Sequence, residues 1–303
     1  METNFEKIVH LERPDTLSEF ISDEERMTLT SLKITGILGS CDVLDVLDDM
    51  CMAHGTFDEY DDFTLNEEDS PKLIELDLGD CTYVGGTDLP YFGYYTQLHK
   101  IVFPKGIRCC IDNTWESGFS DSGTLSTVVF PEGIVKLDGF TNCPKIEGIV
   151  IPESVKEFGE YAFYATSISS IWLSKHIEFI SGGTFAYTLI EKYEIDPLNP
   201  NFTVIDGIIF TKDRTKLIAY PPKAKVRHYA IPEGTKIITT HAFFGNSVES
   251  IALPESLETI EEYAFRSCRA KIIPSNGQPF SIFPHNEGRI RTKRDNWEPK
   301  DNE

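Results

Sequence analysis

The feature that most limits what this chain can fold into is a segment that recurs from Leu98 to Cys268. Its two clearest copies read PESVKEFGEYAF, from Pro152 to Phe163, and PESLETIEEYAF, from Pro254 to Phe265. Related blocks recur with an underlying period of about 22 residues. They begin at Leu98, Leu125, Ile146, Ile168, Ile190, Val226 and Val248. Because such a period is typical of stacked repeat units, we interpret the copies as structural tiles and not as duplicated active sites.

The tiles share the template L-x-x-I-x-I-P-x-x-V-x-x-I-x-x-x-A-F. Its x-I-x-I part alternates as a short strand with one buried face does, and the proline ends the strand because it has no N–H to donate. The spacing of V-x-x-I-x-x-x-A-F predicts a loose turn of helix on the return leg. One tile cannot bury its own apolar face, whereas stacked tiles can. The template therefore predicts an α+β repeat solenoid with a parallel sheet of short strands on its concave face.

Two segments depart from the template. Residues 196–222 contain two strand-like runs with turn candidates at Asp206-Gly207 and Lys212-Asp213, which predicts an inserted β-hairpin projecting from the solenoid edge. Residues 1–83 predict a strand, a helix from about Ser40 and a first repeat-like strand, and we interpret them as an N-terminal cap. The expected organisation is a cap at 1–83, repeats at 84–275, and a terminal cap with a polar tail at 276–303.

The net charge of the chain limits the classes of molecule that it is expected to bind. The net charge is −21, and residues 1–83 contribute −17 of it, with 22 Asp and Glu against 5 Lys and Arg. An acidic surface repels nucleic acid and anionic lipid, so neither is an expected partner. No apolar run approaches the roughly 18 to 20 residues of a membrane span. The basic run from Arg289 to Arg294 is interpreted as part of a solvated tail.

The cysteine content and the N-terminal sequence give information on the cellular compartment of the protein. The seven cysteines are odd in number and show neither a CxxC pair nor a Cys/His zinc spacing, so we expect free thiols and no metal or cofactor. The first twenty residues lack the apolar core of a signal peptide. Composition leaves two alternatives: a cytoplasmic chain, or a secreted chain whose leader was removed and replaced by Met1.

The residues that could carry catalysis fall into repeat positions. His241 occupies the slot of Tyr161 and Tyr263, one residue before the Ala-Phe pair. Cys143 and Cys268 each lie three residues after a tile phenylalanine, where a small group completes the turn. The sequence contains no GxSxG, HExxH, P-loop or GxGxxG motif. We therefore expect a protein that is not an enzyme.

At this point the residues resemble a known family. IPESVKEFGEYAFYAT and LPESLETIEEYAFRSC look like the BspA-type leucine-rich repeat, a bacterial class close to the Treponema pallidum type. ISDEERMTLTSLKITGILGSCDVLDVLDDM and LIELDLGDC are similar to the cap that such proteins have in gut Bacteroides. The resemblance implies a leucine-rich-repeat solenoid, usually exported and surface-associated, with binding of host or matrix proteins ascribed to some members. It implies an extracellular or cell-surface location, with a cytoplasmic one as the alternative.

The strand face is the first candidate for binding a partner. The residue between the two buried anchors of x-I-x-I points outward, and these positions would form a ladder about 5 Å per rung. The predicted partner-binding residues are Val102, Val129, Val150, Trp172 and Glu194 at this position, and His228 at the preceding outward position. High β-propensity on a small sheet is the alternative explanation for the valines. Exposed Trp172 fits that alternative less well, because tryptophan is enriched at binding hot spots.

A loop of aromatic residues is the second candidate. The stretch DLPYFGYYTQ places Tyr91, Phe92, Tyr94 and Tyr95 around a glycine, a composition typical of adaptable contact loops. The alternative is that these rings cover the first repeats.

These features together predict a non-catalytic protein-binding or adhesion module that uses the concave face of the solenoid. One alternative is a glycan-binding accessory protein that uses the aromatic loop. The other is a structural or assembly element of a surface complex. The sequence leaves the oligomeric state and the identity of the partner open.

Overall fold

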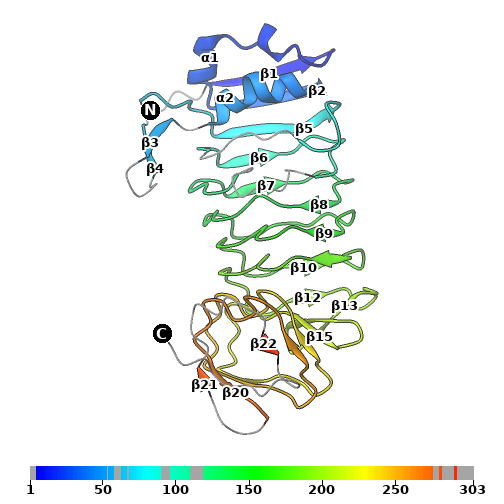
Figure 1. Cartoon of the computed structure of the whole chain (residues 1–303). Coiled ribbons are helices and arrows are strands. Elements are labelled where there is room, and N and C mark those ends of the chain that lie inside the picture. Colours follow the sequence, from blue (N-terminus) through cyan, green and yellow to red (C-terminus); the bar gives the residue numbers. More distant parts are fainter. Residues whose placement is uncertain are drawn as a thin grey trace. The chain divides into compact units, whose positions relative to one another are not determined.

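The computed structural model describes residues 5–52, 54–57, 63–66, 68–89, 96–109, 119–275, 280–281 and 290–291. The chain divides into two compact units, Met1–Ile168 and Ser169–Glu303. Each is built from short strands joined by turns, and the described helices lie near the N-terminus (Figure 1). The predicted solenoid of short parallel strands with a strand-helix cap is confirmed.

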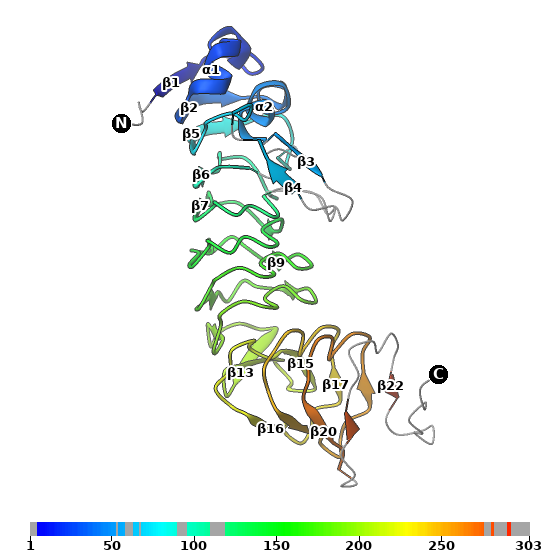
Figure 2. The ribbon, with the colours of Figure 1, turned by 90° about the vertical axis from the view of Figure 1, so that its left-hand side faces the viewer.

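A five-stranded parallel sheet runs through the first unit in the order β1-β2-β5-β6-β7. Its strands are β1 (Glu6–Leu11), β2 (Ser31–Leu38), β5 (Glu75–Tyr83), β6 (Lys100–Val102) and β7 (Thr127–Val129). Figure 2 shows them as successive rungs. The strand predicted near residue 31 and the first repeat-like strand are both present. The cap thus extends the sheet of the repeats, and it contributes one strand, β1, that was not predicted.

Short helices cover the core at this end of the sheet. They are η1 (Leu17–Glu19), α1 (Asp23–Thr28), the π-helical η2 (Asp42–Leu47) and α2 (Asp48–Cys51). Ser22 and Glu25 form a capping box on α1. Buried Asp42 accepts hydrogen bonds from the backbone N–H groups of Asp15, Leu17 and Gly39 at 2.8–2.9 Å, which ties the first loop to the start of the predicted helix. The antiparallel pair β3 (Gly55–Phe57) and β4 (Phe63–Leu65) follows.

In five of the tiles the structure describes a strand on the return leg, so the predicted helical turn is wrong there. These strands are β8 (Lys136–Leu137), β9 (Glu157–Phe158), β11 (Phe179–Ile180), β17 (Ile237–Ile238) and β19 (Thr259–Ile260). β8 pairs in parallel with β9, and β17 with β19. The backbone then turns through left-handed residues, with φ of 56° at Tyr161 and 55° at Ala165. Left-handed residues do not continue a right-handed helix. The apolar residues of the return leg therefore lie in a short strand and in the turn that follows it.

The second unit carries two rows of strands. The front row consists of β10 (Trp172–Leu173) with β12 (Glu194–Ile195), and of β16 (His228–Ala230), β18 (Ser250–Ala252) and β20 (Lys271–Ile273). β21 (Phe280–Ser281) pairs antiparallel with β20, and β22 (Ile290–Arg291) pairs antiparallel with β19. Both rows therefore end on strands of reversed direction.

The insertion forms a three-stranded meander. β13 (Phe202–Ile205) and β14 (Ile208–Thr211) make the predicted hairpin, closed by Asp206 at φ 53° and Gly207 at φ 82°. Two positive φ values identify a type I′ turn, which matches the twist of the flanking strands. β15 (Lys216–Ala219) then pairs antiparallel with β14 and in parallel with β17. The expectation that the hairpin projects from the edge is wrong, because β15 joins it to the return row.

Asn199 fastens the insertion to the preceding tile. Its fully buried side-chain amide donates to the carbonyls of Ser174 and Ile177, each at 3.0 Å. Its side-chain oxygen accepts from the N–H groups of Asn201 and Phe202, each at 2.8 Å. All the hydrogen-bonding capacity of the amide is used by backbone groups from the two segments.

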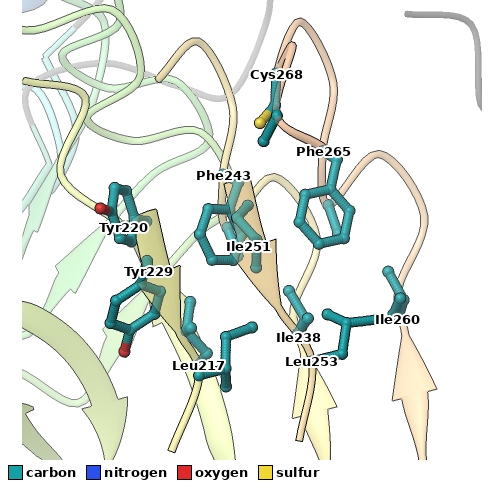
Figure 3. Packing of buried hydrophobic residues seen from close by; sticks show 14 of the residues in the cluster. Leu217, Tyr220, Tyr229, Ile238, Phe243, Ile251, Leu253, Ile260, Phe265 and Cys268 are labelled. Atoms are coloured by element: carbon teal, nitrogen blue, oxygen red, sulfur yellow. The ribbon is translucent and has the colours of Figure 1, made fainter. Parts of the chain in front are cut away.

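The core of each unit is a stack of tile residues. In the first unit Phe140 and Phe163 stack with ring centroids 5.8 Å apart. In the second, Phe243 and Phe265 stack at 5.0 Å, with Ile251 packed in the same cluster (Figure 3). The phenylalanine of the Ala-Phe pair therefore recurs as one rung of a ring stack, which explains why it is common to the tiles.

We expect Asn199→Ala to lower the free energy of unfolding by about 2–4 kcal/mol, because four backbone groups, three of them in buried hydrogen bonds, lose their partner. Urea unfolding followed by circular dichroism measures the loss. Asn201→Ala is the matched control: its exposed amide makes one side-chain bond, of 3.2 Å, to Ile177. Equal losses in the two variants would contradict the role given to Asn199.

Candidate functional site

The strand face of the first unit presents outward side chains in aligned rows. One row consists of Ile8, Lys33, Asp77, Val102 and Val129, which are successive register partners across the five strands. The neighbouring row consists of Glu6, Ser31, Glu75, Lys100 and Thr127. The predicted register of Asp77, Val102 and Val129 is thus confirmed, and β1 and β2 lengthen both rows by two residues.

Burial follows the expected alternation in these strands. Ile101 and Val128 face the core, whereas Val129 is 44% exposed and Val102 is half-buried. Val150 is 84% exposed, although it lies in extended backbone outside any strand. The side chain of an exposed valine makes little contribution to the core, so these positions are open to other roles.

Charged pairs border the apolar part of this face. Lys33 Nζ lies 2.7 Å from Asp80 and 3.4 Å from Asp77, and Lys100 Nζ lies 3.6 Å from Glu75. The Asp80 carboxylate, which accepts a hydrogen bond from Lys33, has its pKa lowered, so it stays ionised. The ion pairs hold the polar side chains along the strands and leave Val102 and Val129 accessible beside them.

In the second unit the face contains a tryptophan beside an acid. Trp172 is 51% exposed and pairs in register with Glu194, which is also exposed. Glu194 accepts a hydrogen bond from Lys192 on the same segment. An indole that is half accessible next to a carboxylate combines a large apolar contact with a directional acceptor.

The strands β16, β18 and β20 form a second part of this face. His228, Ser250 and Lys271 form one row, and Ala230, Ala252 and Ile273 form another. His228 Nδ1 lies 2.9 Å from Ser250 Oγ. His228 is therefore outward-facing as predicted, in the row next to the alanines.

The Ser250–His228–Glu249 group does not have the geometry of a catalytic triad. The Glu249 carboxylate is 3.9 Å from His228 Nε2 and instead accepts a hydrogen bond from Arg227 Nε at 2.8 Å. His228 and Glu249 are exposed on the strand face. A triad needs a carboxylate that orients the imidazole and a site that excludes water. The group is a surface hydrogen-bond network.

His241 and the repeat cysteines are structural. The His241 ring stacks on Tyr263 with centroids 5.6 Å apart and adopts φ 60°, as Tyr161 and Tyr263 adopt φ 56° and 55°. Burial raises the pKa of the Cys143 thiol to about 12, and Cys143 donates to the Phe119 carbonyl. A thiol held protonated is a poor nucleophile. The expected repeat roles of His241 and Cys143 are confirmed.

The aromatic loop of Tyr91, Phe92, Tyr94 and Tyr95 lies outside the described residues, so its role stays a prediction. Among the described residues, no group of three His, Cys, Asp or Glu side chains is placed to hold a metal ion. The six described cysteines are free thiols. Within the same part of the chain, no helix is long and apolar enough to cross a membrane.

Sequence reasoning missed two cap residues of the outward row, Ile8 and Lys33. The signal was present in KIVHL, where Val9 and Leu11 alternate with exposed Ile8 and His10. A period of two over five residues predicts a strand. The scattered charges of the first twenty residues concealed it.

Comparison with known proteins identifies the repeats. A family model described as the BspA type leucine rich repeat region matches residues 90–216 and 219–283 in six copies. A search of curated proteins gave no match.

Several solved bacterial structures are similar to this chain. The pneumococcal vaccine antigen PcpA is 17% identical, with a TM-score of 0.46, covering 85% of this chain and 54% of that chain. A leucine-rich repeat protein from Eubacterium ventriosum is 16% identical, with a TM-score of 0.44, covering 83% and 63%. A leucine rich cell surface protein from Faecalibacterium prausnitzii is 19% identical, with a TM-score of 0.45, covering 81% and 60%. This chain spans 54%, 63% and 60% of their respective lengths.

We expect the second unit to lose stability as the pH falls from about 6.5 towards 4. Burial, and then the charge of Arg266, lowers the pKa of His241 from 6.5 to about 4. Because the folded pKa lies below the unfolded one, the stability is present above pH 6.5 and is lost as the pH falls through 4. The loss is about 1–2 kcal/mol, reduced from the full linkage energy because His241 lines a hollow open to solvent.

His241→Tyr is the matched variant, because other tiles carry tyrosine in this slot at the same backbone conformation. Unfolding of both proteins across pH 4–7 isolates the histidine contribution, since the carboxylates titrate equally in each. The same slope in both proteins would contradict the assignment.

Proposed function

Because this chain belongs to the BspA-type leucine-rich repeat family, we propose that it is a non-catalytic module that binds a protein partner through its strand face. The observation that carries the proposal is the exposure of Val129, Val150 and Trp172 at outward positions of the tiles. The same positions in β18 and β20 carry Ala252 and Ile273. In each unit, accessible apolar side chains at outward tile positions beside charged ones fit a protein surface better than a small solute.

Two features support a partner protein over a substrate. The reactive groups on the face, His228 and Ser250, are engaged in surface hydrogen bonds, and the buried thiols have raised pKa values. Tryptophan, tyrosine and arginine near the centre of a contact contribute most of the binding energy in protein interfaces, which favours Trp172 as the main contact. The candidate contact residues are Val102, Val129, Val150, Trp172, Glu194 and His228.

We propose a location at the outer surface of a bacterial cell, where the partner would be a host or extracellular-matrix protein. The similarity of the tiles to a usually exported class supports this location.

We expect Trp172→Ala to weaken binding to a captured partner by about 1–3 kcal/mol, or roughly fivefold to 150-fold, while circular dichroism stays unchanged. The partner is first selected by biolayer interferometry from purified matrix and host-surface proteins. Leu198→Ala is the matched control, because Leu198 is an exposed apolar residue in a turn of the insertion, outside the strands. Unchanged affinity in Trp172→Ala, with loss on substitution of Asp88–Gln97, would transfer the contact to the aromatic loop.

We expect trypsin added to intact producing cells to cut the protein within minutes, because a surface location leaves its lysines and arginines accessible. Immunoblotting of cells and medium measures the loss, with a ribosomal protein as the control for lysis. Protection until the cells are broken open would place the protein inside them.

A further inference from the structure

The strand β1 lies at one end of its sheet. In the order β1-β2-β5-β6-β7 it pairs with β2, and among the described residues no other strand pairs with it. Figure 2 shows it as the end rung of its row. In the second unit, by contrast, the antiparallel strands β21 and β22 cover β20 and β19. Within the described residues, β1 is thus an edge strand, whereas β20 and β19 each pair with a reversed strand.

The direction of the backbone groups follows from the hydrogen bonds at its start. The Phe5 carbonyl accepts from the N–H groups of Thr30 and Ser31 at 2.9 and 3.2 Å, so Phe5 directs its polar groups towards β2. Successive residues of a strand direct these groups to opposite sides. The N–H and C=O groups of Ile8 and His10 therefore point away from β2, along the outer edge.

This edge has little of the protection found on natural edge strands. β1 is six residues long, contains no proline, and keeps an unbroken register with β2 from Glu6↔Ser31 to Leu11↔Gly36. Its one lysine, Lys7, is held by Glu25 at 2.6 Å on the inner side. Ile8 is 74% exposed, and Phe5 and Phe20 are also exposed. A regular strand with exposed apolar side chains is a template for pairing with another chain.

The net charge of the residues around β1 determines which kind of partner segment can pair with its outer edge. Residues 5–30 contain seven carboxylates and three cationic side chains. All three cations are in ion pairs: Lys7 with Glu25, Arg13 with Glu19, and Arg26 with Asp49. The seven carboxylates against three cations give residues 5–30 a net charge of −4, which repels a second copy of this chain, since the copy would bring the same charge to the edge. The same net charge attracts an extended segment with alternating lysine or arginine.

We propose that β1 binds an extended, cationic segment of a partner protein as an added strand, through the backbone groups of Ile8 and His10. Backbone hydrogen bonds supply the affinity in this mode, and alternate side chains of the added strand supply the selectivity. The edge is separate from the strand face of the first unit, which carries Val102 and Val129, so the two surfaces are able to bind different segments of a partner.

Hydrogen exchange followed by NMR tests the proposal on the whole chain. In the free protein the Ile8 and His10 amides are expected to exchange at least a hundredfold faster than those of Lys7 and Val9, which face β2. A synthetic octapeptide alternating lysine and valine is expected to slow the first two at least tenfold. The matched peptide alternating glutamate and valine is expected to leave them unchanged.

Variants separate this edge from the strand face. Ile8→Pro removes one outward N–H without touching the bonds to β2, and is expected to weaken binding of the lysine peptide at least tenfold. Ile8→Lys adds a positive charge that repels the lysine peptide at an exposed position. This variant tests the same edge if the proline variant does not fold. Val129→Lys, on the strand face, is expected to leave peptide binding unchanged.

Three results would overturn the proposal. The first is slow exchange of Ile8 and His10 in the free monomer, which would mean that the edge is already covered. The second is equal peptide binding by wild type and both Ile8 variants. The third is a mass by light scattering that doubles with concentration and returns to the monomer value in Ile8→Lys, which would make a second copy the occupant.

Discussion

The whole structure depends on the inability of one tile to bury its own apolar face. A tile of about 22 residues has too little surface to enclose a core, so Phe163 and Phe265 are buried only because a ring from the preceding tile stacks on each. Stacking fixes the rise from tile to tile, and that rise places the strands at hydrogen-bonding distance. The register of the outward side chains therefore follows from the packing of the rings inside.

The same constraint explains why much of the front face could be predicted. Alternation with a period of two separates inward Ile101 and Val128 from outward Val102 and Val129 without any knowledge of the fold. Once the tiles are aligned, equivalent positions must lie in one row. The hairpin turn was also predictable, because an Asp-Gly pair between apolar runs is among the strongest local signals. In each case short-range chemistry agrees with the tertiary arrangement.

Other parts could not be predicted, for physical reasons that differ. Apolar residues three apart, as at Val155 and Phe158, fit both a helix and a turn followed by a strand, and the left-handed φ of Tyr161 decides for the latter. The parallel pairing of β15 with β17 joins segments that are far apart in the sequence, so no local sequence pattern predicts it. The strand β1 was concealed because its outward positions are charged or lie beside charges. The role of the aromatic loop remains a prediction from composition.

The separation of ring stack and outward rows has a consequence for how such a chain changes over generations. Inward positions are constrained by two neighbouring tiles at once, whereas outward positions such as Val129 and Trp172 are constrained by neither. Duplication or loss of a whole tile would lengthen or shorten the face by one rung and leave every other rung intact. The strand face can thus change in length through the number of tiles and in chemistry through single outward residues, while the packing of the core stays the same.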